Sequence, residues 1–556
     1  MMRAVSLTAG LLDRLQRARR ADLPFSEPAG ARAWIEALPA DRPREVNKAL
    51  AAAITAFCAH SSGPSTQIAV LEVLRPRIHV VQAELARQYR GAPAPLGPEL
   101  LGLVDDILAL WTLVANAYLG FAQGWSGRLG RHDKNKEQAT ALHRALDATS
   151  RLIAEHYSAY RLPPETVYSG LHALYLTAEH LDLIKVRVPD PFQALGETRC
   201  RDAWVRALLI DGCLPREHHH RELGLIFRLL ERWAPKVRVV EAEEDAEDGT
   251  ASLFVDLQEA CGLRPWRGAG DNVRTLRMGA LANEIRQTLT ILRKGGDIPD
   301  LDFGPGLSRR DFERLLLLLH RQWCEGGIRR TSERQSAATA AHVSSGLRAA
   351  HFYLGRKPFE QPFEPSSLPS RGNARRSEHS AQRVRAATDY LQAHGIRAEQ
   401  WQIKDESPSG LGMTRGHDEP GEPWIGQGLL LAVRPIGHSN TLVGTVRWIQ
   451  ADKDGALQIG VSLLPGIPVA IAARIPAASE FEPAILMLPL PAANAPSSLV
   501  MAPGLLKPRM VVDIYREGID RIEITALLEG GTEFERFAFM PAGSVYDPST
   551  EYDPSR

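Results

Sequence analysis

A short motif of acidic, hydroxyl and glycine residues follows an apolar segment near residue 400. Asp405, Ser407 and Gly410 come directly after 401–404 in the pattern DxSxxG. A carboxylate can accept charge-assisted hydrogen bonds from the N–H groups of a ligand, and a serine hydroxyl can bind a base or a phosphate. The glycine would allow a tight turn and a close approach of the ligand to the backbone. The same residues could instead form only an Asx-type turn at a strand end.

Arginines four positions apart provide candidate partners for an anionic ligand. Arg330 and Arg334 precede a predicted strand at 340–343, whereas Arg371 and Arg375 precede a predicted helix at 381–393. A guanidinium group binds phosphate oxygens, or the O6/N7 edge of guanine, through two parallel hydrogen bonds, and it also stacks on base planes. Two such groups and a strand-end carboxylate would suit a ligand with phosphates and guanines. The arginines could also be ordinary solvated surface residues.

Short apolar segments around the motif predict strands. The segments 429–433, 442–449, 456–464 and 469–473 are separated by Gly, Pro, Asn and Asp, which is typical of a small antiparallel barrel or sandwich. The clearest hairpin joins 442–449 to 456–463, with Gly455 in its turn. A second set of strands is expected between 498 and 540.

With these strands around it, the DxSxxG motif resembles the PilZ domain, a small β-barrel that binds the bacterial second messenger cyclic di-GMP. The resemblance covers about residues 329–474 and continues through Ile425-Gly-Gln-Gly428 and the hairpin at 442–463. It implies outputs such as control of motility, pili, surface polysaccharide or biofilm. It implies cyclic di-GMP as the ligand, with no metal or other cofactor, and a site made of Arg330, Arg334, Asp405, Ser407 and Gly410.

The PilZ signature also includes an RxxxR pair just before the first barrel strand, and two pairs in this chain compete for that role. The position before a predicted strand favours Arg330 and Arg334. Members of the family normally have a shorter gap between the pair and the DxSxxG motif, which favours Arg371 and Arg375. We choose the first pair and interpret 355–400 as an insertion.

The first 240 residues carry a helical pattern. A 3.6-residue apolar spacing recurs between proline breaks, which predicts a helical bundle or stacked helical hairpins. The acidic run 241–248 marks a boundary. We therefore predict a multidomain α+β protein. Its parts are a helical domain at 1–240, a small helical or mixed connecting domain at 241–328, a PilZ-like antiparallel barrel at 329–475, a second β-rich segment at 476–541 and a disordered tail at 542–556.

Composition limits the classes of partner and compartment. Lys and Arg total 66 and Asp and Glu total 66, so the formal net charge is zero and the basic excess expected of a duplex-binding protein is missing. Five cysteines without a CxxC spacing argue against a disulfide framework and favour a cytoplasmic protein. The uncharged segment 107–125 approaches spanning length, but Thr112, Asn116 and Gln123 interrupt it. We predict a buried bundle helix there and no membrane span.

Other chemistry-bearing residues give no positive case for an enzyme or a metal site. Glu217-His218-His219-His220 is a surface cluster in our interpretation, because adjacent helical residues point in different directions. The sequence has no GxSxG, HExxH or complete phosphate-loop motif. We therefore expect a non-catalytic cyclic di-GMP receptor that couples ligand binding to a helical domain with a protein partner. The alternative is a scaffold protein whose degenerate barrel has lost its ligand.

Overall fold

The computed structural model divides the chain into two compact units. One unit comprises residues 1–92 and 96–329, and the other comprises 93–95 and 330–556. The structure describes residues 23–60, 62–123, 132–193, 195–241, 252–264, 270, 272–296, 307–327, 334–362, 376–416, 424–452, 456–476, 478–491, 495–531 and 533–543. The predicted acidic boundary beyond Glu241 and the tail beyond Gly543 lie outside the described residues.

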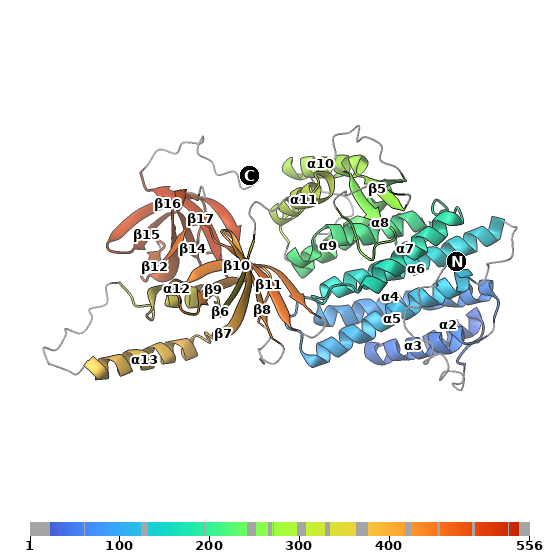
Figure 1. Cartoon of the computed structure of the whole chain (residues 1–556), viewed down its shortest axis with the longest axis horizontal. Helices are drawn as coiled ribbons and strands as arrows, with labels where there is room; N and C mark the ends of the chain where they lie inside the picture. The colour runs from blue at the N-terminus through green and yellow to red at the C-terminus, as the bar shows by residue number, and fades with distance from the viewer. Residues whose placement is uncertain are drawn as a thin grey trace. The chain divides into compact units, whose positions relative to one another are not determined.

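The first unit is mainly helical (Figure 1). Its first eight labelled helices are α2 (Pro28–Glu36), α3 (Pro43–Cys58), α4 (Pro64–Tyr89), α5 (Pro98–Gln123), α6 (His132–Ser158), α7 (Glu165–His180), α8 (Cys200–Gly212) and α9 (His220–Trp233). The helices α2 to α5 each begin at a proline, whose fixed φ suits the first helical turn and whose missing N–H is not needed there. The periodic apolar residues of α4 are buried, in agreement with their spacing: Ile68, Leu71, Leu74 and Ile78.

Residues 107–123 of the predicted bundle helix lie in α5. Within the described ranges, α5 is the one helix long and apolar enough to cross a membrane, and half of its most apolar window is buried inside the unit. It packs against α3, α4 and α6. This packing accounts for its apolar residues, as predicted for a bundle helix.

The region predicted as a separate connecting domain shares the core of the helices before it. It contains β3 (Arg238–Val240), β4 (Leu253–Asp256) and β5 (Val273–Arg277), which form a sheet in the order β3-β5-β4, followed by α10 (Gly279–Arg293) and α11 (Arg309–Cys324). A short pair, β1 (Val188–Pro189) and β2 (Glu197–Thr198), lies earlier in the chain. Leu281 and Phe312 belong to the same hydrophobic cluster as Leu74 of α4. The structure therefore differs from the predicted division at 240/241, because the apolar faces of α10 and α11 complete the helical core.

The second unit contains two closed six-stranded antiparallel barrels (Figure 1). The first barrel is formed by β6 (Gln335–Ser345), β7 (Glu399–Ser407), β8 (Gly410–Arg415), β9 (Leu430–Pro435), β10 (Leu442–Ala451) and β11 (Leu457–Leu463), in the order β10-β11-β8-β7-β6-β9. The predicted hairpin is β10–β11. Two helices, α12 (Leu347–Gly355) and α13 (Arg376–Ala393), separate β6 from β7 in sequence. The predicted strand at 340–343 is part of the longer β6.

The second barrel begins earlier than predicted. It comprises β12 (Ile467–Arg474), β13 (Glu482–Leu488), β14 (Ser498–Met501), β15 (Val511–Tyr515), β16 (Ile519–Gly530) and β17 (Glu535–Pro541), in the order β12-β13-β14-β17-β16-β15. The segment 469–473, which the sequence placed in the first barrel, lies in β12 and pairs with β13 and β15. The predicted boundary at 475 is therefore too late, because the chain changes barrel between β11 and β12.

A shared core joins the two barrels. Leu347 and Ala350 of α12 pack in one hydrophobic cluster with Val443 of the first barrel. The same cluster contains Ile485 of β13 and Phe534, which lies between β16 and β17 of the second barrel. Thr445 of β10 also donates a 3.2 Å hydrogen bond to Glu529 of β16. Burial of these apolar side chains stabilises the pair of barrels as one folded body.

Candidate ligand-binding site

The DxSxxG motif forms the hairpin between β7 and β8. Asp405 and Ser407 are among the last three residues of β7, and Gly410 is the first residue of β8. Ser407 pairs with Gly410 across the hairpin, and the Ser407 hydroxyl donates to the Gly410 carbonyl oxygen at 3.3 Å. Ser407 therefore has a local role in the turn in addition to any role in binding.

Gly410 is required by the packing of strands. A Cβ at this position would lie 2.7 Å from the carbonyl oxygen of Val461 on β11, which is closer than real Cβ contacts. The φ of Gly410 lies outside the left-handed region, so the residue does not serve a left-handed turn. The sequence suggested a glycine that allows a tight turn, but in the structure Gly410 is needed because β8 and β11 approach each other closely here.

Arg334 lies immediately before β6 and contacts Asp405. Ser336 pairs with Asp405 across β6 and β7, so the start of β6 passes beside the carboxylate. Arg334 Nη1 donates to Asp405 Oδ1 at 2.5 Å, and the two side chains remain 26% and 35% exposed. The structure therefore brings together one predicted arginine and the predicted strand-end carboxylate. The other candidates, Arg330, Arg371 and Arg375, lie outside the described residues, so the choice between the two pairs stays a prediction.

A β-bulge turns Asp405 to the outer face of the barrel. Ile403 pairs with Met413, but Asp405 pairs with Gly412, so Lys404 is an extra residue in β7. Ile403 and Met413 are buried, and Gly412, the neighbour of Met413 on β8, faces the other side of the sheet. Without the bulge, Asp405 would share the inward face of Ile403. The extra residue therefore presents the carboxylate to solvent.

The absence of a side chain at Gly412 leaves room for the Asp405 carboxylate. A Cβ at Gly412 would lie 2.6 Å from Asp405 Oδ1 and 2.7 Å from Oδ2. The carboxylate therefore occupies the volume that any larger residue at 412 would fill. We did not single out Gly412 from the sequence, although a glycine inside a strand signals a close approach of other groups.

Comparison with protein families gives two matches. Residues 29–244 match the model described as Cyclic-di-GMP receptor FimW, N-terminal domain, and residues 469–542 match the FimW C-terminal beta-barrel domain. Both ends of the chain match the FimW family. FimW is a family of cyclic di-GMP receptors. The FimW C-terminal match corresponds to the second barrel, and the first barrel lies between the two matched ranges. No curated protein matches the chain.

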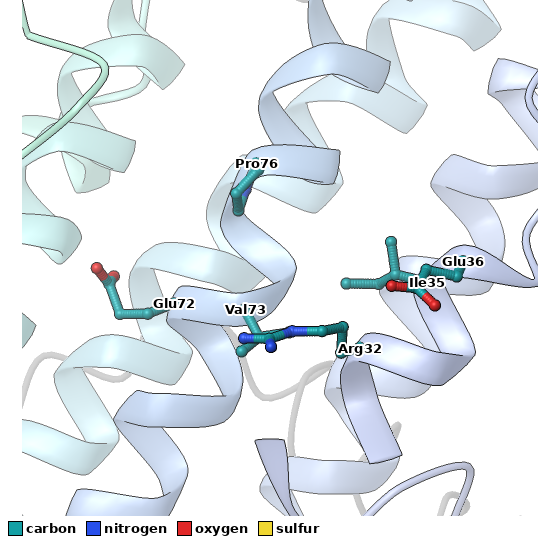
Figure 2. Close-up of a pocket in the computed structure, with 6 residues that line it drawn as sticks. All are labelled: Arg32, Ile35, Glu36, Glu72, Val73 and Pro76. Carbon is teal, nitrogen blue, oxygen red and sulfur yellow. The ribbon is translucent and has the colours of Figure 1, made fainter. Parts of the chain in front are cut away.

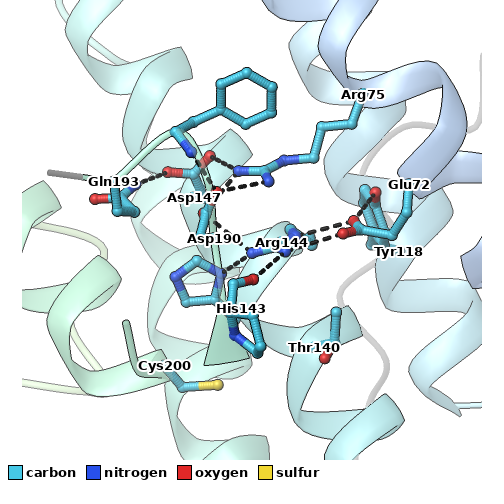
Figure 3. A network of polar contacts seen from close by, with 12 residues as sticks. Glu72, Arg75, Tyr118, Thr140, His143, Arg144, Asp147, Asp190, Gln193 and Cys200 are labelled. Atoms are coloured by element: carbon cyan, nitrogen blue, oxygen red, sulfur yellow. Dashed lines mark hydrogen bonds and ion pairs between the residues drawn. The ribbon is translucent and has the colours of Figure 1, made fainter. Parts of the chain in front are cut away.

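The region of the FimW N-terminal match contains a buried network of charged residues (Figure 3). Arg75 donates two 2.8 Å hydrogen bonds to Asp190. Arg144 donates to both carboxylate oxygens of Glu72 at 2.9 Å. These bonds tie α4 to α6 and to the segment that follows β1. Because the buried charges have partners within the protein, we interpret the network as support for the bundle.

Two residues of α6 in this network, His143 and Asp147, have strongly lowered pKa values. Burial alone would raise the pKa of Asp147, but the guanidinium groups of Arg151, Arg206 and Arg75 hold it well below its usual range. Burial, together with Arg144, lowers the pKa of His143 to about 3. At neutral pH the network therefore holds an ionised aspartate and an uncharged histidine.

A pocket of about 400 Å³ lies between α2 and α4 (Figure 2). It is lined by Arg32, Ile35, Glu36, Glu72, Val73 and Pro76. Pro76 has no N–H, so the helix makes no hydrogen bond from this position to the carbonyl of Glu72. One arginine and two carboxylates give the pocket no excess of positive charge for a ligand with two phosphates.

The three consecutive histidines do not form the single surface cluster predicted, although the ring centroids of His219 and His220 are 4.1 Å apart. His218 is buried, and its Nε2 lies 2.9 Å from the Cys213 carbonyl oxygen. His219 caps α9, while the ring of His220 lies against Gly91. Among the residues that the structure describes, no group of three or more His, Cys, Asp or Glu side chains could hold a metal ion.

Proposed function

We propose that this protein is a cyclic di-GMP receptor that binds its ligand on the outer face of the first barrel. The observation that carries the proposal is the contact between Arg334 and the outward-facing Asp405, beside the β7–β8 hairpin. The matches of both ends of the chain to a family of cyclic di-GMP receptors support the choice of ligand. The proposed ligand-binding residues are Arg334, Asp405, Ser407 and Gly410, with Arg330 as a further predicted contact.

Binding would exchange an ion pair within the protein for contacts with the ligand. Asp405 would accept hydrogen bonds from the N–H groups of guanine, and Arg334 would turn to a phosphate or to the O6/N7 edge. The partly exposed Arg334–Asp405 pair is worth about 0–1 kcal/mol. Hydrogen bonds to charged groups are worth about 1.5–3 kcal/mol each, so the exchange favours the bound state.

Calorimetry of the full chain with cyclic di-GMP tests the proposal. We expect the wild type to bind, and Arg334→Ala and Asp405→Asn each to raise the Kd by about 10- to 150-fold, from the loss of one such hydrogen bond. Asp513→Asn is the matched control. Asp513 accepts a 2.9 Å hydrogen bond from Arg474 in the second barrel, and the two side chains are 17% and 30% exposed, close to the exposure of the proposed site.

The possible outcomes separate the parts of the proposal. Wild-type affinity in both Arg334→Ala and Asp405→Asn would place the ligand elsewhere in the chain. An absence of heat from the wild type at high micromolar ligand would remove the receptor function and favour the scaffold alternative. Equal losses in Asp513→Asn and Asp405→Asn would show a general effect of removing an ion pair.

We further infer that ligand binding is coupled to the helical unit. Arg334 lies only five residues after the boundary between the two units at 329, so a change in its contacts acts on the chain segment that links them. Hydrogen exchange of the full chain measures this effect. Cyclic di-GMP should change the exchange of α2 to α9 in the wild type but not in Asp405→Asn. Unchanged exchange in the wild-type helices would contradict the coupling while leaving the binding site intact.

A further inference from the structure

Trp448 lies on the same cross-strand row as Asp405. Trp448 of β10 pairs with Gly460 of β11, Gly460 pairs with Gly412 of β8, and Gly412 pairs with Asp405 of β7. Residues directly opposite each other in a sheet project from the same face. The carboxylate and the indole are therefore side chains of one face, with only two glycines between them.

A second bulge turns Trp448 to this face. Val446 pairs with Val461, but Trp448 pairs with Gly460, so Arg447 is an extra residue in β10. Val446 and Ile449 are buried in the barrel, while Trp448 is only partly buried. Without the extra residue, Trp448 would point inward with Val446. The bulge at Lys404 in β7 and the bulge at Arg447 in β10 each turn the next side chain to the outer face of the barrel. The strands β8 and β11 lie between these two strands.

The two glycines hold the indole and the carboxylate close together. A Cβ at Gly460 would lie 1.9 Å from Trp448 Nε1, so the pyrrole part of the indole lies over this glycine. The carboxylate of Asp405 lies over Gly412 in the same way. Paired residues on neighbouring strands are about 4.5–5.5 Å apart, so the indole and the carboxylate cover two adjacent buried glycines on one face of the sheet.

We infer that Trp448 is a stacking surface for one guanine of the ligand, while Asp405 accepts hydrogen bonds from the edge of that base. The inference rests on the proposed function and adds an apolar contact to a site described so far by polar groups alone. A base needs a flat apolar neighbour as well as an edge partner, and an aromatic ring provides one for any base. The carboxylate then supplies the preference for guanine, since it pairs with N–H donors.

Calorimetry with cyclic di-GMP on the full chain tests the role of the ring. We expect Trp448→Ala to raise the Kd by about 5- to 150-fold, and Trp448→Phe to raise it much less because phenylalanine still stacks. Trp424→Phe is the control. Its indole donates a 2.7 Å hydrogen bond to Glu399, which is six residues, or about 20 Å, from Asp405 along β7.

Tryptophan fluorescence gives a second readout. Stacking on guanine should quench the emission of Trp448, so ligand-induced quenching should be lost in Trp448→Phe and kept in Trp424→Phe. A wild type that binds, together with a Trp448→Ala variant that binds within two-fold of it, would overturn this inference and leave the proposed function in place. A wild type that does not bind cyclic di-GMP would instead overturn the proposed function.

Discussion

Replacing Gly412 by alanine tests the geometry of the site without removing a charge or a hydrogen-bonding group. The new Cβ would lie 2.6–2.8 Å from three atoms of the Asp405 carboxyl group. Optimal contacts between such atoms are about 3.5–4.0 Å, so the carboxylate must move by about 1 Å. The φ of Gly412 lies outside the left-handed region, so the backbone accepts alanine.

The variant should separate binding from folding. The displaced carboxylate loses a hydrogen bond to the ligand, worth about 1.5–3 kcal/mol, so the Kd for cyclic di-GMP should rise about 10- to 150-fold by calorimetry. The free energy of unfolding should change by less than about 1 kcal/mol. The group that must move is the end of a partly exposed side chain, and alanine in a strand is favoured over glycine by about 0.5–1 kcal/mol.

Gly530→Ala is the matched control for this experiment. Gly530 is also a strand residue, the last one of β16, and a Cβ at this position would meet no atom within 4 Å. This variant should bind the ligand with wild-type affinity. A Gly412→Ala protein that folds and keeps wild-type affinity would refute the reasoning, because the ligand would then not depend on the position of the Asp405 carboxylate.

Three further predictions concern stability. Lowering the pH from 7.5 to 5 should reduce the free energy of unfolding by about 2 kcal/mol through His143 alone. The pKa of His143 is about 3 in the folded protein, below its ordinary value, so the unfolded chain takes up the proton first. Over the same change of pH, the Tm of His143→Gln should fall less than that of the wild type. Asp147→Asn should cost about 3–5 kcal/mol in denaturant unfolding, since it removes the carboxylate that pairs with buried Arg206 and one of the two carboxylates beside Arg75. Gly410→Ala should lower the Tm, unlike Gly412→Ala, because its Cβ meets the fixed Val461 carbonyl.

Local signals in the sequence were sufficient for many elements of the fold. Periodic apolar residues between proline breaks predicted the helices, and a glycine turn between two apolar runs predicted the β10–β11 hairpin. The assignment of β12 failed for a physical reason. An alternating strand pattern shows that one face is buried, but it does not show which of two neighbouring barrels the strand will close.

The buried charge network could not have been foreseen from spacing. Arg75 and Asp190 are 115 residues apart, and each is an ordinary surface residue type. Their burial depends on how α4, α6 and the segment after β1 pack, which no local pattern records. The contact between Arg334 and Asp405, 71 residues apart, was expected only because the DxSxxG motif resembled a known family.

On the outer face of the first barrel, the alternation of inward and outward side chains along a strand predicts the direction of some side chains but not of others. Alternation from Trp401 and Ile403 would place Asp405 inside the barrel, where an unpaired carboxylate is strongly disfavoured, so this conflict itself indicates an extra residue. No such conflict marks Trp448, because an inward tryptophan would be acceptable. Its outward direction becomes visible only through its partner Gly460, which has room for the indole. The carboxylate was therefore recognisable from the sequence, whereas the aromatic half of the proposed site required the strand register.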